Sequence, residues 1–356
     1  MTARPARNHS CPGQPRHAHR TASLPPARRL SQWPIRVVGV IMSSPLPSGK
    51  PINDIDMVEV DGRPLFVVAE YGGGAWTWDP VGDVWTKPPL EPPFEQYPDA
   101  DDPDVDCVAA GLQDERLIIV GGSENHAMVA WDLRSGEVLR EVDEEDDPVT
   151  SVAAVRIDGQ LTFVSGDYGG GIALWEPFQD EPGELAVDHE EAILDLSTGI
   201  VDDCPVLVAG GYDGMVGVWD LRSRRRTGWW EAGDKEPVRG VALTSVGGRP
   251  VAVAGGETGQ VQVWALDDVD RPLIATLPVH EARINALDTV TIDGCPLVVT
   301  GSEDGTVRTW DLARGRQIGD PITSDTECMS ITQLNGRMTA FTADMNGVIH
   351  GWGLEV

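Results

Sequence analysis

Short runs of alternating apolar and polar residues recur along the whole chain, and segments rich in glycine and aspartate separate them. One unit contains an apolar run, a turn, a second run, a tight turn and a third run, at Ile284–Val290, Ile292–Pro296, Leu297–Thr300, Ser302–Gly305 and Thr306–Trp310. Alternation with a period of two residues, interrupted by Gly-rich turns, predicts antiparallel β-hairpins. The 40 glycines and 27 prolines fit many short strands.

Seven similar segments each end in a tryptophan, at Trp78, Trp131, Trp175, Trp219, Trp264, Trp310 and Trp352. Successive tryptophans lie 53, 44, 44, 45, 46 and 42 residues apart, and the clearest copies read GGYDGMVGVWDL, TGSEDGTVRTWDL and AGGETGQVQVWAL. Each copy predicts a small sheet of three clear strands and a weaker fourth. Because such a sheet cannot bury both faces alone, the copies must stack, and a ring of seven leaves no open end.

These segments resemble WD repeats over roughly residues 52–356, and four of them keep the Trp-Asp pair that begins at Trp78, Trp131, Trp219 and Trp310. The resemblance implies an all-β fold, a seven-bladed β-propeller of four-stranded antiparallel blades in which the seven tryptophans are structural. It also implies a scaffold that binds proteins or peptides and is not an enzyme. A fold alone does not name the partner.

The family's structural hydrogen-bond set joins a histidine before the first strand, an aspartate in the tight turn, a serine or threonine, and the tryptophan. The resemblance implies this set in blade six, from His280, Asp304, Thr300 or Ser302, and Trp310. Blade four offers His189, Asp213 and Trp219. The other blades lack the histidine, so we expect packing alone to hold them.

The last repeat stops after its third strand, and the family resemblance implies that an N-terminal strand completes it. Ile35–Met42, which reads IRVVGVIM, is the best candidate for this closing strand. We therefore expect a propeller over residues 35–356 and a disordered basic tail, rich in proline and arginine, over residues 1–34. Two alternatives for the tail are a twin-arginine signal at Arg28-Arg29 and a true start near Met42.

The net charge of −30 is unevenly spread, because residues 1–53 carry +8 and the remainder carries −38. The strongly acidic part of the chain after residue 53 should repel nucleic acid and attract a basic partner. The alternative is that the acidic residues only keep a large β protein soluble. No apolar run is long enough to span a membrane. Five cysteines scattered singly predict no disulfide framework, so we expect a reduced, cytoplasmic protein, as a monomer.

Sites for chemistry are scarce in the sequence, and no cofactor or metal is expected. The tail segment Asn8–His19 carries ligand-type residues, and the acidic loop Asp99–Asp106 lacks the glycine and terminal glutamate of an EF-hand. No phosphate-binding loop or nucleophile elbow occurs. The alternative function is a hydrolase or lyase with its site at the central channel, which requires inward-facing histidines or carboxylates that the aligned repeats do not clearly supply.

One repeat position stands out as a binding position, the residue just before the turn aspartate. It holds Tyr71, Glu124, Tyr168, Tyr212, Glu257, Glu303 and Met345, so three of the four tyrosines of the chain occupy it. In a propeller these turns crowd one face. Tyrosine offers a large contact area, and glutamate attracts Arg or Lys, which can also stack on a tyrosine ring. The alternative is that the tyrosines only fill grooves between blades.

A second ring comes from an early first-strand position, at Asn53, Asp106, Thr150, Leu194, Arg239, Asn285 and Glu327. Arg239 and Asn285 join the tyrosines and glutamates as candidate partner-binding residues. Acidic loops on the same side extend over Glu91–Asp106, Glu141–Asp147, Asp180–Glu191 and Glu231–Glu236. Trp229 and Trp230, in the fourth strand of blade four, are expected to pack at the outer edge, with a side-docking site as the alternative.

Overall fold

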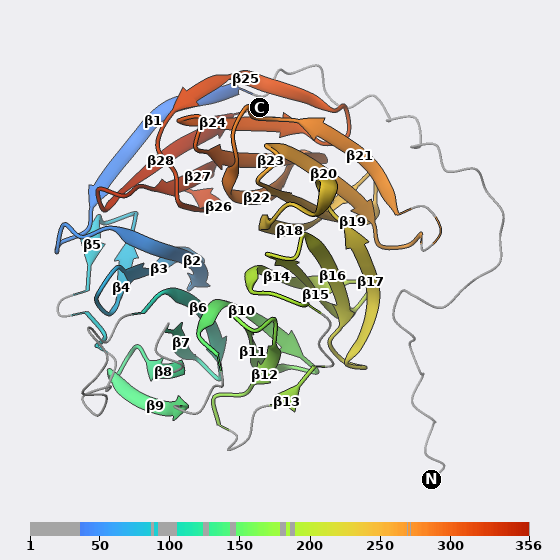
Figure 1. The fold of residues 1–356 in the computed structure, drawn as a ribbon. Coiled ribbons are helices and arrows are strands. Elements are labelled where there is room, and N and C mark those ends of the chain that lie inside the picture. The colour runs from blue at the N-terminus through green and yellow to red at the C-terminus, as the bar shows by residue number, and fades with distance from the viewer. Residues whose placement is uncertain are drawn as a thin grey trace, which may run out of the picture.

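The computed structural model of the chain is a ring of seven four-stranded antiparallel sheets around a central channel (Figure 1). It describes residues 36–86, 89–91, 105–123, 128–142, 147–178, 183–185, 189–268, 270 and 272–355. The fold is therefore the all-β, seven-bladed propeller that the repeats predict. Glu124, the tail over residues 1–34 and most of the loop Glu91–Asp106 lie outside the described residues.

Each of the first four blades uses four consecutive strands, and the first strand of each lies innermost. Blade 1 contains β2 (Ile52–Val60), β3 (Arg63–Glu70), β4 (Ala75–Asp79) and β5 (Val84–Trp85). Blade 2 contains β6 (Cys107–Gln113), β7 (Arg116–Gly122), β8 (Met128–Asp132) and β9 (Glu137–Val142). Blade 3 contains β10 (Val149–Ile157), β11 (Gln160–Asp167), β12 (Ile172–Trp175) and β13 (Gly183–Glu184). Blade 4 contains β14 (Ile193–Val201), β15 (Cys204–Gly211), β16 (Met215–Asp220) and β17 (Arg225–Glu231).

The remaining three blades follow the same plan, except that the last one borrows a strand from the N-terminal side. Blade 5 contains β18 (Val238–Val246), β19 (Arg249–Gly256), β20 (Gln260–Ala265) and β21 (Leu273–Pro278). Blade 6 contains β22 (Ile284–Ile292), β23 (Cys295–Ser302), β24 (Thr306–Asp311) and β25 (Arg316–Thr323). Blade 7 contains β26 (Cys328–Leu334), β27 (Arg337–Ala343), β28 (Val348–Glu355) and β1 (Arg36–Pro45).

The hairpin between the first and second strands has the same backbone in every blade. Two consecutive residues adopt positive φ there, at Asp61-Gly62, Asp114-Glu115, Asp158-Gly159, Asp202-Asp203, Gly247-Gly248, Asp293-Gly294 and Asn335-Gly336. Two positive φ angles define the turn whose twist matches paired strands, and Asp, Asn and Gly tolerate them best. The short-range sequence signal therefore fixes the first hairpin of each blade.

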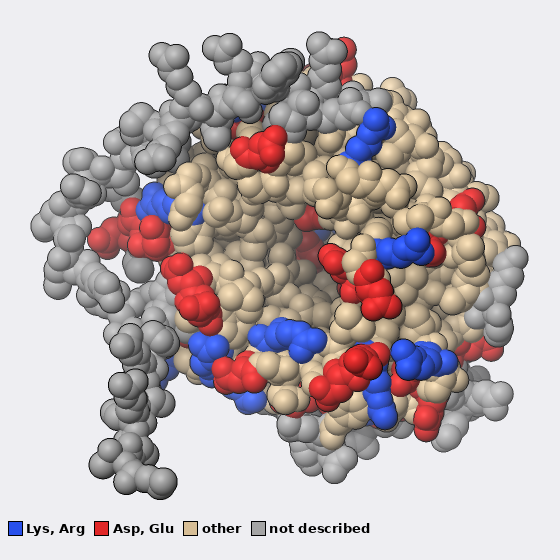
Figure 2. Space-filling view, turned by 180° about the vertical axis from the view of Figure 1, so that it is seen from behind, with Lys and Arg blue, Asp and Glu red and all other residues tan. Residues whose placement is uncertain are grey.

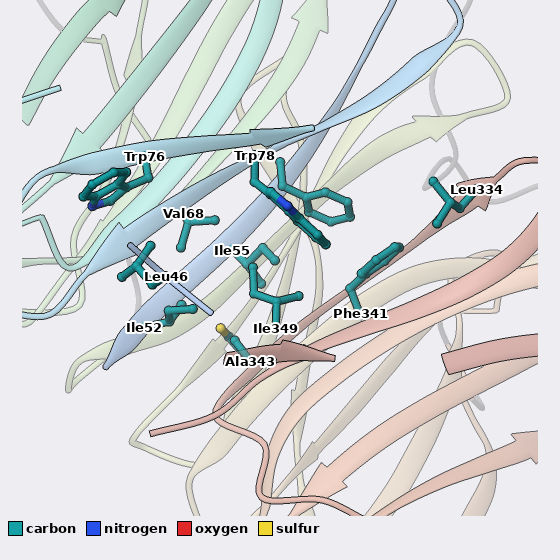
Figure 3. Close-up of a cluster of buried hydrophobic side chains, with 12 residues drawn as sticks. Leu46, Ile52, Ile55, Val68, Trp76, Trp78, Leu334, Phe341, Ala343 and Ile349 are labelled. Atoms are coloured by element: carbon teal, nitrogen blue, oxygen red, sulfur yellow. The ribbon is translucent and has the colours of Figure 1, made fainter. Parts of the chain in front are cut away.

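The hydrophobic core lies between neighbouring blades. One cluster joins Ile55 and Trp78 of blade 1 to Phe341 and Ile349 of blade 7 (Figure 3). The ring centroids of Trp78 and Phe341 lie 5.7 Å apart. Six of the seven repeat tryptophans are buried, and Trp310 is partly buried. A blade therefore gains its core from its neighbours, as the stacking argument requires.

The N-terminal strand closes the ring, as the family resemblance implies. β1 pairs with β28 over Arg36–Pro45, a few residues beyond the expected Ile35–Met42. Ser44 then ties this strand to blade 1, because its hydroxyl donates to Asp83 at 2.6 Å and accepts from Trp85 Nε1 at 3.0 Å. The closing strand thus joins the last blade to the first.

The cysteines differ from the expectation at one position. Cys107, Cys295 and Cys328 are free, but Cys204 is disulfide-bonded. The described residues contain no disulfide framework, yet the expectation of reduced cysteines fails at Cys204. In the same part of the chain, no helix combines the length and apolar character needed to cross a membrane.

Candidate functional site

The repeat position singled out in the sequence lies at one structural place in the blades. The amides of Tyr71, Tyr168 and Tyr212 each donate to the carbonyl of the residue just before the first strand of the same blade. Glu257 and Glu303 make the same bond, to Pro237 and Arg283. This shared bond fixes the turn between the second and third strands beside the segment that leads into the blade. The five side chains therefore start from equivalent points on one face of the ring.

The three tyrosine rings and Met345 are exposed at this face. Their exposed fractions are 60% for Tyr71, 65% for Tyr168, 50% for Tyr212 and 56% for Met345. Rings that filled grooves between blades would lie largely out of water. We therefore favour a contact surface over the alternative that they only fill grooves.

The two described glutamates at this position already have basic partners within the chain. Arg239 Nε lies 2.7 Å from Glu257 Oε1, and Arg283 Nη2 lies 2.7 Å from Glu303 Oε1. Their charges are therefore largely compensated. The sequence did not reveal these pairs, because the arginines precede their partners by 18 and 20 residues and meet them only across a β-hairpin.

Residues of the second ring sit on a β-bulge at the start of the first strand. The strand pairing skips one residue in five blades, at Asn53, Thr150, Leu194, Arg239 and Asn285. An extra residue bends a strand and redirects its side chain. The bulge explains why the side chain at this position departs from the regular strand alternation, and no local sequence pattern predicts it.

Three bulge residues bridge to the next blade. Asn53 Nδ2 donates to Asp106 at 3.0 Å, and Thr150 Oγ1 donates to the carbonyl of Ile193. Asn285 Nδ2 donates to the carbonyl of Thr326 at 3.3 Å and approaches a Glu327 oxygen at 3.5 Å. Asn285 thus has a positioning role on this face in addition to its predicted role in binding.

Acidic side chains without basic partners gather beside Tyr168 and Tyr212. Burial raises the pKa of Asp167, and the neighbouring Asp147 carboxylate raises it further against hydrogen bonds from nearby amides. Glu190 and Glu191 are exposed in the segment that leads into blade 4. None of these four carboxylates forms an ion pair within the described part of the chain. Unpaired negative charge therefore lies at blades 3 and 4 on this face.

The structural hydrogen-bond set of blade 6 forms without its tryptophan. His280 Nδ1 donates to Asp304 at 2.9 Å, and Thr300 Oγ1 donates to His280 Nε2 at 2.7 Å. Burial lowers the pKa of His280 despite the carboxylate, which supports a neutral ring. Trp310 Nε1 is buried without a hydrogen-bond partner in the described residues, so Trp310 contributes through packing.

Blade 4 keeps the His–Asp pair but lacks the threonine. His189 Nδ1 lies 3.1 Å from both carboxylate oxygens of Asp213. Ala209 occupies the position that Thr300 holds in blade 6, so the described residues offer no partner for the buried His189 Nε2. The His189 ring instead packs against Trp229, with centroids 4.5 Å apart.

Replacing Thr300 by valine should reproduce the incomplete set of blade 4 in blade 6. His280 Nε2 then loses its donor in a buried site, and the free energy of unfolding should fall by about 1–3 kcal/mol. Urea unfolding would measure the loss. Thr291→Val on the neighbouring strand β22 is the control, because Thr291 is exposed. Equal stability of the two variants would refute the role given to Thr300.

The tryptophan pair at the edge of blade 4 is packed, as expected. Trp229 contacts His189, and Trp230 stacks on Trp264 with centroids 6.0 Å apart and planes 7° apart. The Arg226 guanidinium covers Trp229 at 4.7 Å. These contacts favour edge packing over a side-docking site.

Comparison with known families agrees with the architecture. The family model described as WD domain, G-beta repeat matches residues 184–220 and residues 271–311. The chain is a seven-bladed propeller that contains WD repeats. Each match begins near the outer strand of one blade and ends after the third strand of the next. No curated protein matched the sequence.

The two matched WD repeats are those that contain the His–Asp pairs of blades 4 and 6. The sequence repeat is offset from the structural blade, because it includes the fourth strand of the preceding blade. This offset leaves blade 7 without its outermost strand until β1 supplies it. WD-repeat propellers are generally scaffolds that bind proteins and are not enzymes.

Proposed function

We propose that this WD-repeat propeller binds a peptide or protein segment across the face that carries Tyr71, Tyr168 and Tyr212. The observation behind the proposal is the exposure of the three rings, each at least half open to solvent at one repeat position. Large aromatic rings held on a rigid scaffold give contact area at a low entropic cost. A cytoplasmic location and a monomeric state stay predictions from the sequence.

The ligand is proposed to contribute Arg or Lys, with its basic group placed over blades 3 and 4. Glu257 and Glu303 already form ion pairs with arginines of the same chain, so they attract a basic group of the ligand less strongly than unpaired carboxylates would. The unpaired carboxylates beside Tyr168 and Tyr212 supply the charge, and the rings supply stacking surfaces for a cation. Arg239 and Asn285 then serve as contacts at the rim of the channel.

Selection of a displayed library of random peptides on the purified protein tests both parts of the proposal. Enriched peptides should contain Arg or Lys, and Tyr71→Ala/Tyr168→Ala/Tyr212→Ala should weaken their binding at least about tenfold. The matched control is Val84→Ala/Ile200→Ala/Leu273→Ala, which removes three similarly exposed apolar side chains elsewhere. Melting curves should first show that both variants are folded.

The outcomes separate the site from the ligand chemistry. Peptides that bind both triple variants equally would refute the tyrosine face as the site. Peptides that lose binding to the tyrosine variant but carry no basic residue would keep the face and refute the preference for Arg or Lys. Capture from a native lysate with the same two variants would then identify the natural partner.

A further inference from the structure

The large exposed side chains on the face that carries the three tyrosines form two pairs. The first pair is Tyr168 and Tyr212, from the neighbouring blades 3 and 4. The second pair is Met345 and Tyr71, from blades 7 and 1, which meet where β1 closes the ring. The two pairs lie on opposite sides of the central channel (Figure 1), and Asp or Glu atoms are visible in the hollow at the centre of the ring (Figure 2).

Backbone contacts hold the turns of the first pair side by side. The Tyr212 amide donates to the carbonyl of Ala192 at 2.8 Å, in the segment that leads into blade 4. The turn that carries Tyr168 packs on the same segment, because a Cβ at Gly170 would lie 2.6 Å from the carbonyl oxygen of His189. One segment therefore contacts both turns, and the two rings start from adjacent points of the face.

The second pair is held in the same way across the closure of the ring. The Tyr71 amide donates to the carbonyl of Pro51 at 3.0 Å. The turn that carries Met345 packs on the residue before this proline, because a Cβ at Gly347 would collide with the Lys50 carbonyl. The segment between β1 and β2 therefore contacts both turns, so Met345 and Tyr71 become neighbours only when blade 7 meets blade 1.

The two pairs differ in the charges beside them. The first pair is flanked by four carboxylates that form no ion pair within the described part of the chain, at Asp147, Asp167, Glu190 and Glu191. The acids in the turns of the second pair are buried and bonded. Glu70 lies 3.3 Å from Lys50 Nζ, and Asp344 accepts from two backbone amides of its own turn at 2.9 Å. The second pair is therefore an apolar surface whose neighbouring carboxylates already have partners.

We propose that Met345 and Tyr71 form an apolar subsite, the closure subsite, for the same ligand that places its basic group over Tyr168 and Tyr212. This inference rests on the proposed function and makes the ligand bipartite. It carries a basic residue and an apolar residue, joined by a stretch that crosses the mouth of the channel. Charge sets the orientation, because the unpaired carboxylates of blades 3 and 4 attract the basic end.

The side chains of the closure subsite suit an apolar anchor. Methionine is unbranched and polarizable, so Met345 can adapt to apolar groups of different shapes. The Tyr71 ring adds a large contact area at a low entropic cost. Because the stretch between the two anchors ties them together, binding of one raises the effective concentration of the other. Loss of either anchor should therefore weaken binding at least about tenfold.

Parallel selection of a displayed library of random peptides tests the closure subsite. Peptides enriched on the wild type should carry a basic and an apolar residue at a recurring separation. Peptides enriched on Met345→Ala/Tyr71→Ala should keep the basic residue and lose the preference for the apolar one. Tyr168→Ala/Tyr212→Ala should show the reverse. Melting curves should first show that both variants are folded.

A double-mutant cycle then locates the contact of the apolar residue. Replacing that residue by alanine in a peptide selected on the wild type should weaken binding to the wild type about tenfold. The same change should leave binding to Met345→Ala/Tyr71→Ala unchanged, because this protein already lacks the subsite. The control Val84→Ala/Ile200→Ala removes two similarly exposed apolar side chains elsewhere and should respond as the wild type does. Fluorescence anisotropy of the labelled peptides measures each affinity.

The outcomes separate this inference from the proposed function. An apolar residue that is not enriched, or that contributes equally to both proteins, would overturn the closure subsite and leave the proposed function intact. Peptides that bind Tyr168→Ala/Tyr212→Ala as tightly as the wild type would refute the bipartite ligand and the proposed placement of its basic group. Absence of any enriched peptide would overturn both. If Met345→Ala/Tyr71→Ala does not fold, Met345→Ala alone takes its place, because this side chain is 56% exposed.

Discussion

Removal of residues 1–42 should lower the melting temperature by roughly 10 °C relative to a chain that lacks only residues 1–35. The longer deletion takes away most of β1, which pairs with β28 from Arg36 to Pro45. Lost strand pairing and exposed apolar surface on blade 7 together cost about 5 kcal/mol. The edge of β28 would also become available for pairing with another chain.

The comparison isolates the strand, because both chains lack the tail and differ only in residues 36–42. Calorimetric melting at several protein concentrations measures the loss and reveals self-association through the open edge. Melting temperatures within about 2 °C of each other would contradict the role of β1 as the closing strand.

Features that repeat within one blade could be predicted from the sequence. The turn residues of the first hairpin, the alternation of each strand and the terminal tryptophan all act over short distances and recur in every copy. Superposition of the copies also identified the turn position of Tyr71, Tyr168 and Tyr212. The equivalent backbone bonds of these residues confirm that the repeats had been aligned correctly.

Features that depend on contacts across hairpins or between blades could not be predicted. A β-bulge adds a residue without changing the composition, so the redirection of Asn53 or Leu194 has no local signal. The pairing of Arg239 with Glu257 and the bond from Val241 to Asp195 require the register of strands that are distant in sequence. The sequence likewise does not show which candidate group bonds to His280. The Thr300 hydroxyl makes this hydrogen bond, whereas Trp310 Nε1 has no hydrogen-bond partner in the described residues.

Substituting Gly259 by alanine should lower the free energy of unfolding by about 3 kcal/mol, from two separate causes. Gly259 lies in the turn between the second and third strands of blade 5 and has a φ of +66°. A side chain there adopts a strained backbone, which costs about 1–2 kcal/mol. In addition, a Cβ at this position would lie 2.6 Å from the carbonyl oxygens of both His280 and Ala282.

The second cause arises at the boundary between blades. The Gly259 carbonyl accepts from the His280 amide at 2.9 Å, so the turn of blade 5 sits directly on the segment that positions His280 in blade 6. Both contacts with the Cβ are with backbone, which cannot move aside without displacing this segment. Overpacking of this kind adds about 1–3 kcal/mol.

Gly305 provides the matched control for this prediction. It holds the equivalent turn position in blade 6 with a φ of +75°, but a Cβ there would meet nothing within 4 Å. Gly305→Ala should therefore cost only the backbone strain, about 1–2 kcal/mol. Urea unfolding of both variants separates the two causes. Equal losses of unfolding free energy in the two variants would mean that the close contact between blades 5 and 6 does not contribute to the requirement for glycine at Gly259. A larger loss for Gly259→Ala would show that this turn also serves to seat the next blade.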